Sequence, residues 1–201
     1  MRILMVSPYP PARDGLANYA VQEVKRLRAD GHDVEVLSPG PSAAHHHLDL
    51  VGVRGALALA RRVRGYDRVI VQYHPNIFFG DRPTPAERSR TYAALAVAFR
   101  AAHHVEVRVH EYPHAGAETR GEATAARQMW AAVDRISVHT ERERGEFATA
   151  FGIAPARISI EDHGANFEKR TNLDKVHARA RLGVLAGTSR VPGDGRRDPD
   201  R

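Results

Sequence analysis

Short apolar runs alternate with longer amphipathic stretches along most of the chain. The first run, residues 2–7, shows no polar alternation, which is typical of a strand buried on both faces of a parallel sheet. The stretch after it repeats apolar residues at three- and four-residue spacing up to Gly31, which indicates a helix. The two patterns recur to about residue 182. They predict strands over residues 2–7, 33–37, 68–73, 105–109, 135–139 and 157–160, and helices over residues 15–30, 54–65, 85–102, 120–132, 141–150 and 172–182.

The order of these elements predicts the fold class. Strands that alternate with helices over short connections form parallel sheets with right-handed crossovers. We therefore expect an α/β fold over residues 1–183, a single Rossmann-like domain of three layers with a mainly parallel sheet. Residues 184–201 are polar and rich in glycine and proline, so an unstructured tail is expected there.

Two of the expected helices begin with a capping box. Thr84 precedes a proline and stands three residues before Glu87, and Thr140 stands three residues before Glu143. In this pattern the threonine and the acid each satisfy a backbone amide that the helix leaves free. The pattern predicts sharp helix starts after Thr84 and after Thr140.

The turn between the first strand and the first helix holds three prolines and then Asp14 and Gly15. The first amides of a helix lack internal partners and the helix dipole adds positive potential, so a glycine here lets the backbone approach an anion. We interpret the turn as facing a phosphate. The second strand ends at Ser38-Pro39 without an acid and the first turn lacks G-x-G-x-x-G, which argues against a nicotinamide site.

Composition narrows the classes of protein that remain. The 201 residues include no cysteine, so a disulfide scaffold and a thiolate metal site are excluded. The net charge is +6, but arginines are spread among acids, as in residues 141–144, rather than gathered in a basic arm, which argues against nucleic-acid binding. We expect a cytoplasmic protein. The basic helix over residues 54–65 is also compatible with weak peripheral contact with the inner face of the membrane.

Histidines stand at several expected strand ends and loops. His74 follows the third expected strand, where an open α/β sheet builds its site, so we place it for ligand contact, with a structural role in a turn as the alternative. Residues 45–47 are three consecutive histidines. We interpret them as an exposed loop without a metal, because adjacent side chains point in different directions.

His110, Glu111 and His114 match the letters of the zinc-protease motif H-E-x-x-H. That motif requires both histidines on one face of a helix. Here a strand precedes them, and Pro113 removes an amide and biases Tyr112 away from helical angles. We favour a strand-end loop in which His110 and Glu111 line a cleft, with a zinc hydrolase as the remote alternative.

Five segments in a fixed order carry a family resemblance. They are the start Arg2 to Pro11 with Gly15, Leu16 and Tyr19, the turn at residues 31–34, and residues 109–113, 133–140 and 163–167. Together they resemble the N-terminal half of a GT-B glycosyltransferase of family 4, over about residues 1–183. The departure is Asp14, which stands where many members have a second glycine.

The resemblance implies transfer of a sugar, with retention, from a nucleotide-diphosphate sugar to a sugar, lipid or small-molecule acceptor. It implies no cofactor and no required metal, and a cleft between two Rossmann-like domains, of which the N-terminal one binds the acceptor. By the resemblance, His110 and Glu111 are catalytic residues near the transferred sugar. The residues expected to bind the donor phosphate and the substrate are Asp14, Gly15, Leu16, Tyr19, His74, His163 and Gly164.

The donor-binding domain that the resemblance implies is not found in the sequence. In the family that domain carries two glutamates separated by seven residues, and no two glutamates here are eight positions apart. Three interpretations remain. The chain is an acceptor domain that works with a separately encoded donor domain, a non-catalytic truncated remnant or binding module, or a zinc hydrolase.

Overall fold

The structure, a computed structural model, describes residues 1–12, 14–111, 119–161 and 172–183, and its main feature is one seven-stranded parallel sheet. Every strand pair is parallel, and the order is β3-β2-β1-β4-β5-β6-β7. The strands are β1 (Arg2–Val6), β2 (Asp33–Ser38), β3 (His46–His47), β4 (Arg68–Tyr73), β5 (Val105–Val109), β6 (Arg135–Val138) and β7 (Ile158–Ile160). The predicted α/β fold with a parallel sheet is confirmed.

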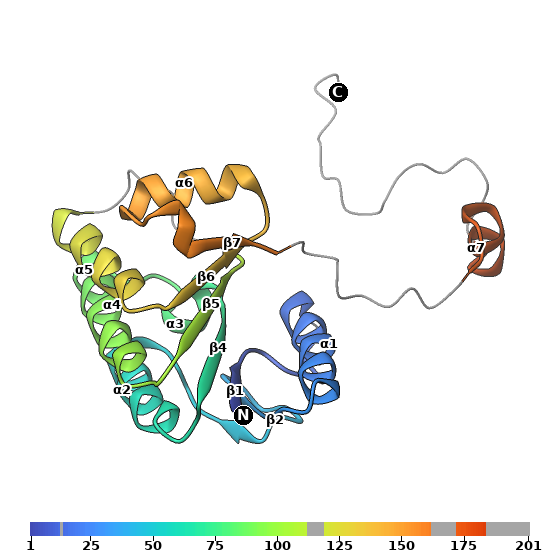
Figure 1. The fold of residues 1–201 in the computed structure, drawn as a ribbon, viewed down its shortest axis with the longest axis horizontal. Helices are drawn as coiled ribbons and strands as arrows, with labels where there is room; N and C mark the ends of the chain where they lie inside the picture. The colour runs from blue at the N-terminus through green and yellow to red at the C-terminus, as the bar shows by residue number, and fades with distance from the viewer. Residues whose placement is uncertain (13, 112–118, 162–171, 184–201) are drawn as a thin grey trace. The chain divides into compact units, whose positions relative to one another are not determined.

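Helices cover the two faces of the sheet unequally. Helix α1 lies on one face, and α2, α4 and α5 lie together on the other (Figure 1). The helices are α1 (Gly15–Ala29), α2 (Gly52–Val63), α3 (Pro75–Phe78), α4 (Pro85–Arg100), α5 (Arg120–Ala131) and α6 (Glu141–Phe151), with a 3₁₀ turn at Pro155–Arg157. Helix α7 (Lys175–Arg181) belongs to a second unit, Glu168–Arg201, and the first unit is Met1–Phe167.

Alternation along the strands separates two apolar cores. Leu4 and Val6 of β1 belong to the larger core, which also holds the fully buried Trp130. Ile3 and Met5 point the other way and pack in a smaller core with Val24, Leu27, Val34, Val36 and Ile70. Burial of each such side chain contributes about 1.5–3 kcal/mol to folding. The smaller core fixes α1 over β1, β2 and β4.

The expected helix starts are present. Thr84 Oγ1 accepts a hydrogen bond from the Glu87 amide at 3.3 Å, and Glu87 Oε2 accepts one from the Thr84 amide at 2.8 Å. The hydrogen bonds from Thr84 lower the pKa of Glu87. Thr140 and Glu143 form the same reciprocal pair at α6. Among the described residues, no helix has both the length and the apolar character of a membrane span.

The interpretation of residues 45–47 as an exposed loop was wrong in part, because His45 and His47 are exposed but His46 and His47 belong to a strand. His46 and His47 form β3 and pair with Leu37 and Ser38 of β2. His45 Nδ1 accepts the Val36 amide at 3.0 Å, and His46 Nε2 lies 2.5 Å from Glu35 Oε2. The imidazoles of His45 and His46 therefore bind groups of the neighbouring strand β2. A strand of two residues is too short to show a hydrophobic periodicity, so the sequence pattern did not predict β3.

Candidate functional site

Polar side chains gather at the carboxyl ends of β4, β5 and β6. His110 Nε2 lies 2.5 Å from Gln72 Oε1, so the imidazole donates to a fully buried amide. The His110 ring lies 5.0 Å from the His139 ring and meets the Tyr19 ring edge-on at 5.6 Å. We call Tyr19, Gln72, His110 and His139 the carboxyl-edge cluster. It brings together two of the residues expected from the sequence, Tyr19 and His110.

The strand register explains this gathering. Gln72 of β4 is paired with Arg108 of β5, so His110, two residues after Arg108, lies on the same face of the sheet and diagonally opposite Gln72. The His110 amide donates to the Tyr73 carbonyl at 3.0 Å. His139 follows β6 as His110 follows β5, and its Nδ1 donates to the Glu161 carbonyl at 2.9 Å beside β7. Parallel strands bring their carboxyl ends to one edge, which is where open α/β sheets bind ligands.

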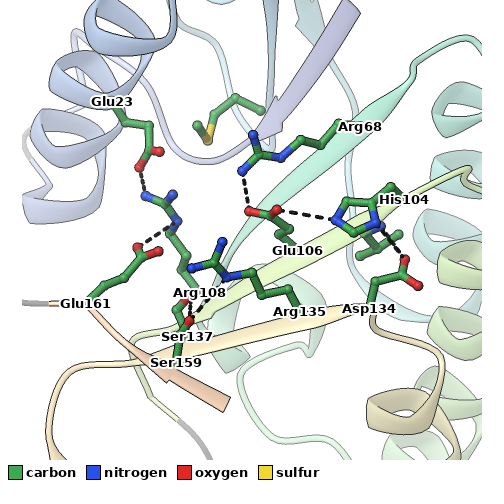
Figure 2. A network of polar contacts seen from close by, with 12 residues as sticks. Glu23, Arg68, His104, Glu106, Arg108, Asp134, Arg135, Ser137, Ser159 and Glu161 are labelled. Carbon is green, nitrogen blue, oxygen red and sulfur yellow. Dashed lines mark hydrogen bonds and ion pairs between the residues drawn. The ribbon is translucent and has the colours of Figure 1, made fainter. Parts of the chain in front are cut away.

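A buried ion network centred on Arg108 contacts the cluster through Tyr19. Figure 2 shows Arg108 of this network between Glu23 and Glu161. The guanidinium of Arg108, which is 3% exposed, forms an ion pair with the fully buried Glu23 of α1, and its Nε lies 3.3 Å from Glu161 Oε2. Arg108 also donates to the Tyr19 hydroxyl at 3.3 Å. A buried charge needs a partner and hydrogen bonds, and here both acids serve one arginine. The network therefore holds α1 in place and orients Tyr19.

The network continues toward the amino ends of the strands, on the same face of the sheet (Figure 2). Glu106 forms an ion pair with Arg68, and His104 Nε2 lies 3.3 Å from Glu106 Oε1. Asp134 accepts the Val105 amide at 2.7 Å and lies 3.6 Å from His104 Nδ1. These charged groups pair with one another, so we assign them a structural role.

The turn before α1 has room for a ligand but is already capped. Asp14 is the N-cap residue, and its carboxylate accepts the Leu16 amide at 2.8 Å. A Cβ added at Gly15 would meet no atom within 4 Å, so the space beside that backbone is open. Ser7, at the end of β1, has a fully buried hydroxyl without a hydrogen-bond partner among the described residues. An anion here would compete with the Asp14 carboxylate for the Leu16 amide.

His74 and Glu111 form a second pair next to the cluster. His74 Nε2 lies 2.7 Å from Glu111 Oε2, and His74 Nδ1 accepts the Asn76 amide at the start of α3. The adjacent residues His110 and Glu111 thus have separate partners, as successive side chains of an extended chain do. His74 has a structural role as a cap while remaining 28% exposed.

Other expected residues cannot be placed. His163 and Gly164 lie outside the described residues, and so does His114 of the H-E-x-x-H letters. His110 follows a strand, not a helix, and its Nε2 is engaged by Gln72. Within the described ranges, no three His, Cys, Asp or Glu side chains are grouped so that they could hold a metal ion.

Sequence reasoning missed Gln72, Arg108, Glu23 and His139. A signal for two of them was available. Gln72 interrupts the apolar residues of β4, and Arg108 lies in the strictly alternating sequence of β5, which indicates a sheet with one polar face. Glu23 could not be linked to Arg108 in this way, because only the packing of α1 brings it there.

Comparison with solved structures identifies the class of fold. Two structures of an α-glucosyltransferase in complex with UDP and a 13-mer DNA containing an HMU base match with TM-scores of 0.53 and 0.52. Each is 12% identical to this chain over 81% and 80% of its length. The chain has a GT-B glycosyltransferase-like fold. It spans only 42% and 41% of the matched chains, so it corresponds to less than half of each. No protein-family model and no curated protein matches the sequence.

Proposed function

We propose that this domain is the acceptor-side half of a retaining glycosyltransferase similar to family 4, which transfers a sugar from a nucleotide-diphosphate sugar. The observation that carries the proposal is the carboxyl-edge cluster, which lies at the carboxyl ends of β4, β5 and β6, next to the topological switch point between β1 and β4. The chain leaves β1 toward β2 and β3 and returns to β4 on the other side of β1. Crevices at such points are the usual ligand sites of open parallel sheets.

In this proposal the turn before α1 and the cluster form one wall of the donor site. The open backbone at Gly15 approaches the diphosphate, with Asp14, Leu16 and Tyr19 around it. His110, held by Gln72 and Tyr19, contacts the transferred sugar together with Glu111. Fixed amides and dipoles then stabilise the charge that develops on the leaving phosphate. His74, His163 and Gly164 complete the substrate-binding set.

A second domain is required to hold the nucleotide, because the chain spans less than half of the matched chains. That domain lies outside the 201 residues, whether in the same polypeptide or in another. The proposed acceptor is a sugar, a lipid or a small molecule. The matched proteins were solved with DNA, whereas the dispersed arginines in the sequence of this chain argue against a nucleic-acid acceptor, so DNA is tested as a control acceptor.

Turnover assays test the proposal against a free-standing enzyme. The 201-residue chain is incubated with UDP-glucose, GDP-mannose or UDP-N-acetylglucosamine, and binding and product are measured separately. We expect weak, saturable binding of at least one nucleotide sugar and no transfer to sugar, lipid or DNA acceptors. Steady turnover by the chain alone contradicts the need for a second domain. Stoichiometric zinc that is lost in His110→Ala would support the hydrolase instead.

A further inference from the structure

A hollow of about 490 Å³ lies beside the amino ends of β1 and β4 and shares no residue with the carboxyl-edge cluster. Its volume is in the range of small-molecule sites, roughly 300–1,000 Å³. Polar groups from β1, β3, the second half of α2 and the turn between α2 and β4 line it. They are Arg2, His46, His47, Arg61, Arg62 and Tyr66.

Arg61 and Arg62 are the two cations of this hollow that are not paired with a protein group among the described residues. Both side chains are exposed, and neither has a hydrogen bond or an ion pair with any residue that the structure describes. Helix α2 is held by Leu59 and Val63, which are fully buried. The backbone that carries both arginines is therefore fixed beside the hollow, and their guanidinium groups have no acidic partner among the residues that the structure describes.

Glu35, which pairs with the lining residue Arg2, is already engaged. Glu35 Oε2 accepts hydrogen bonds from the Tyr66 hydroxyl and from His46 Nε2, both at 2.5 Å, and Oε1 accepts one from Arg2 at 3.4 Å. These contacts, from Tyr66 first and then His46, lower the pKa of Glu35 to about 2. Arg2 also donates to the Gly65 carbonyl at 3.0 Å just beyond α2, where the negative end of the helix dipole lies. Arg2 also pairs with Asp33 at 3.9 Å, and its amide donates to Asp67 at 2.7 Å. Arg2 therefore offsets the acids and the helix end beside the hollow, and Arg61 and Arg62 are the cations left for an incoming anion.

We propose that this hollow binds a phosphorylated small molecule. Arg61 and Arg62 contact its phosphate, because guanidinium groups bind phosphate oxygens through paired, charge-assisted hydrogen bonds. Leu37, Leu48 and Ala58, which also line the hollow, contact its carbon body. The site goes beyond the proposed function, since it contains none of the residues assigned to the donor or the acceptor.

Calorimetric titration of the 201-residue protein with phenyl phosphate and with inorganic phosphate tests the site. We expect saturable binding of both, with phenyl phosphate tighter because the apolar wall contacts its ring. The double substitution Arg61→Ala/Arg62→Ala weakens binding of both probes by about tenfold or more, because it removes charge-assisted hydrogen bonds to the phosphate. Arg61→Lys/Arg62→Lys keeps the charge and should give a smaller loss.

The matched control is Arg120→Ala/Arg127→Ala on α5, which removes two exposed arginines and the same net charge. It should leave the affinity unchanged. Three results would overturn the site. They are an equal loss of phosphate affinity in the two double alanine variants, no loss of affinity in the Arg61/Arg62 variants, and no saturable binding by the native chain. Equal affinity for phenyl phosphate and inorganic phosphate would show that the apolar residues of the hollow do not contact the ligand. Amide shifts at Tyr19 and His110 instead of at His46 and Tyr66 would place the ligand elsewhere.

Discussion

His74 and Glu111, which follow the neighbouring strands β4 and β5, form an ion pair with 2.7 Å between Nε2 and Oε2. The carboxylate is 62% exposed, and pairs at this exposure contribute about 0–1 kcal/mol to stability. We predict that Glu111→Gln changes the free energy of unfolding by less than about 1 kcal/mol. If Glu111 contacts the sugar as proposed, the same change weakens binding of UDP-glucose about tenfold and leaves binding of UDP unchanged.

Glu141→Gln is the matched control for this prediction, because Glu141 is 68% exposed and pairs with Arg144 at 2.8 Å. It should alter neither affinity. Equal weakening of UDP and UDP-glucose by Glu111→Gln would show that Glu111 does not contact the sugar.

The buried pair of Arg108 and Glu23 should behave differently. Removing Arg108 leaves the fully buried Glu23 with only the half-exposed Arg26, 3.2 Å away, as an ion-pair partner, and breaking a buried pair costs up to about 3–5 kcal/mol. We predict a loss of that size in urea unfolding of Arg108→Met, and recovery of part of it in Arg108→Met/Glu23→Gln. Arg142→Met, which breaks an ion pair at an arginine that is 85% exposed, should have little effect. Similar losses in Arg108→Met and Arg142→Met would contradict the buried network.

The shifted pKa values of Glu35 and Tyr66 predict how the free energy of unfolding depends on pH. The pKa of Glu35 is lowered to about 2, so its contribution is complete above the ordinary value of 4.5 and is lost as pH falls from 4.5 toward 2. Burial, and then the hydrogen bond to Glu35, raise the pKa of Tyr66 to about 12, so that contribution is lost as pH rises from 10 toward 12.

Unfolding measured in Glu35→Gln and Tyr66→Phe separates these two effects. Glu35→Gln should reduce the acid-side loss by about 1–2 kcal/mol, an amount limited by solvent screening of a side chain that is a quarter exposed. Tyr66→Phe should reduce the alkaline loss. An acid limb that is unchanged in Glu35→Gln would contradict the assigned contacts.

Gly55 lies where α2 passes close to the preceding chain. A Cβ there would lie 2.2 Å from the Leu50 carbonyl carbon, so Gly55→Ala forces backbone to move. We predict a loss of about 3 kcal/mol or more in the free energy of unfolding. Gly145→Ala in α6 meets no atom within 4 Å and should instead stabilise by about 0.5–1 kcal/mol. Equal effects at the two glycines would contradict the close packing of α2.

The pattern of the sequence predicted the long elements and missed the short ones. The six expected strands are present because each buries apolar side chains, whereas β3 has only His46 and His47 and depends on pairing with β2. Helix α3 has four residues, too few for a periodic signal. The strand ends were correctly expected to be polar. Which side chains meet there, such as His110 with Gln72, is decided by strand register and by the packing of α1.

The central claim is that the carboxyl-edge cluster forms one wall of a sugar-nucleotide site. Two-dimensional amide NMR of the 201-residue chain, titrated with UDP-glucose and GDP-mannose, tests it directly. We predict saturable shifts at Gly15, Leu16, Tyr19 and His110 with at least one of the two, lost in His110→Ala and retained in His103→Ala, which changes an exposed turn histidine. Shifts confined to other residues, or unchanged in His110→Ala, would contradict the account, as would no shift with either nucleotide sugar.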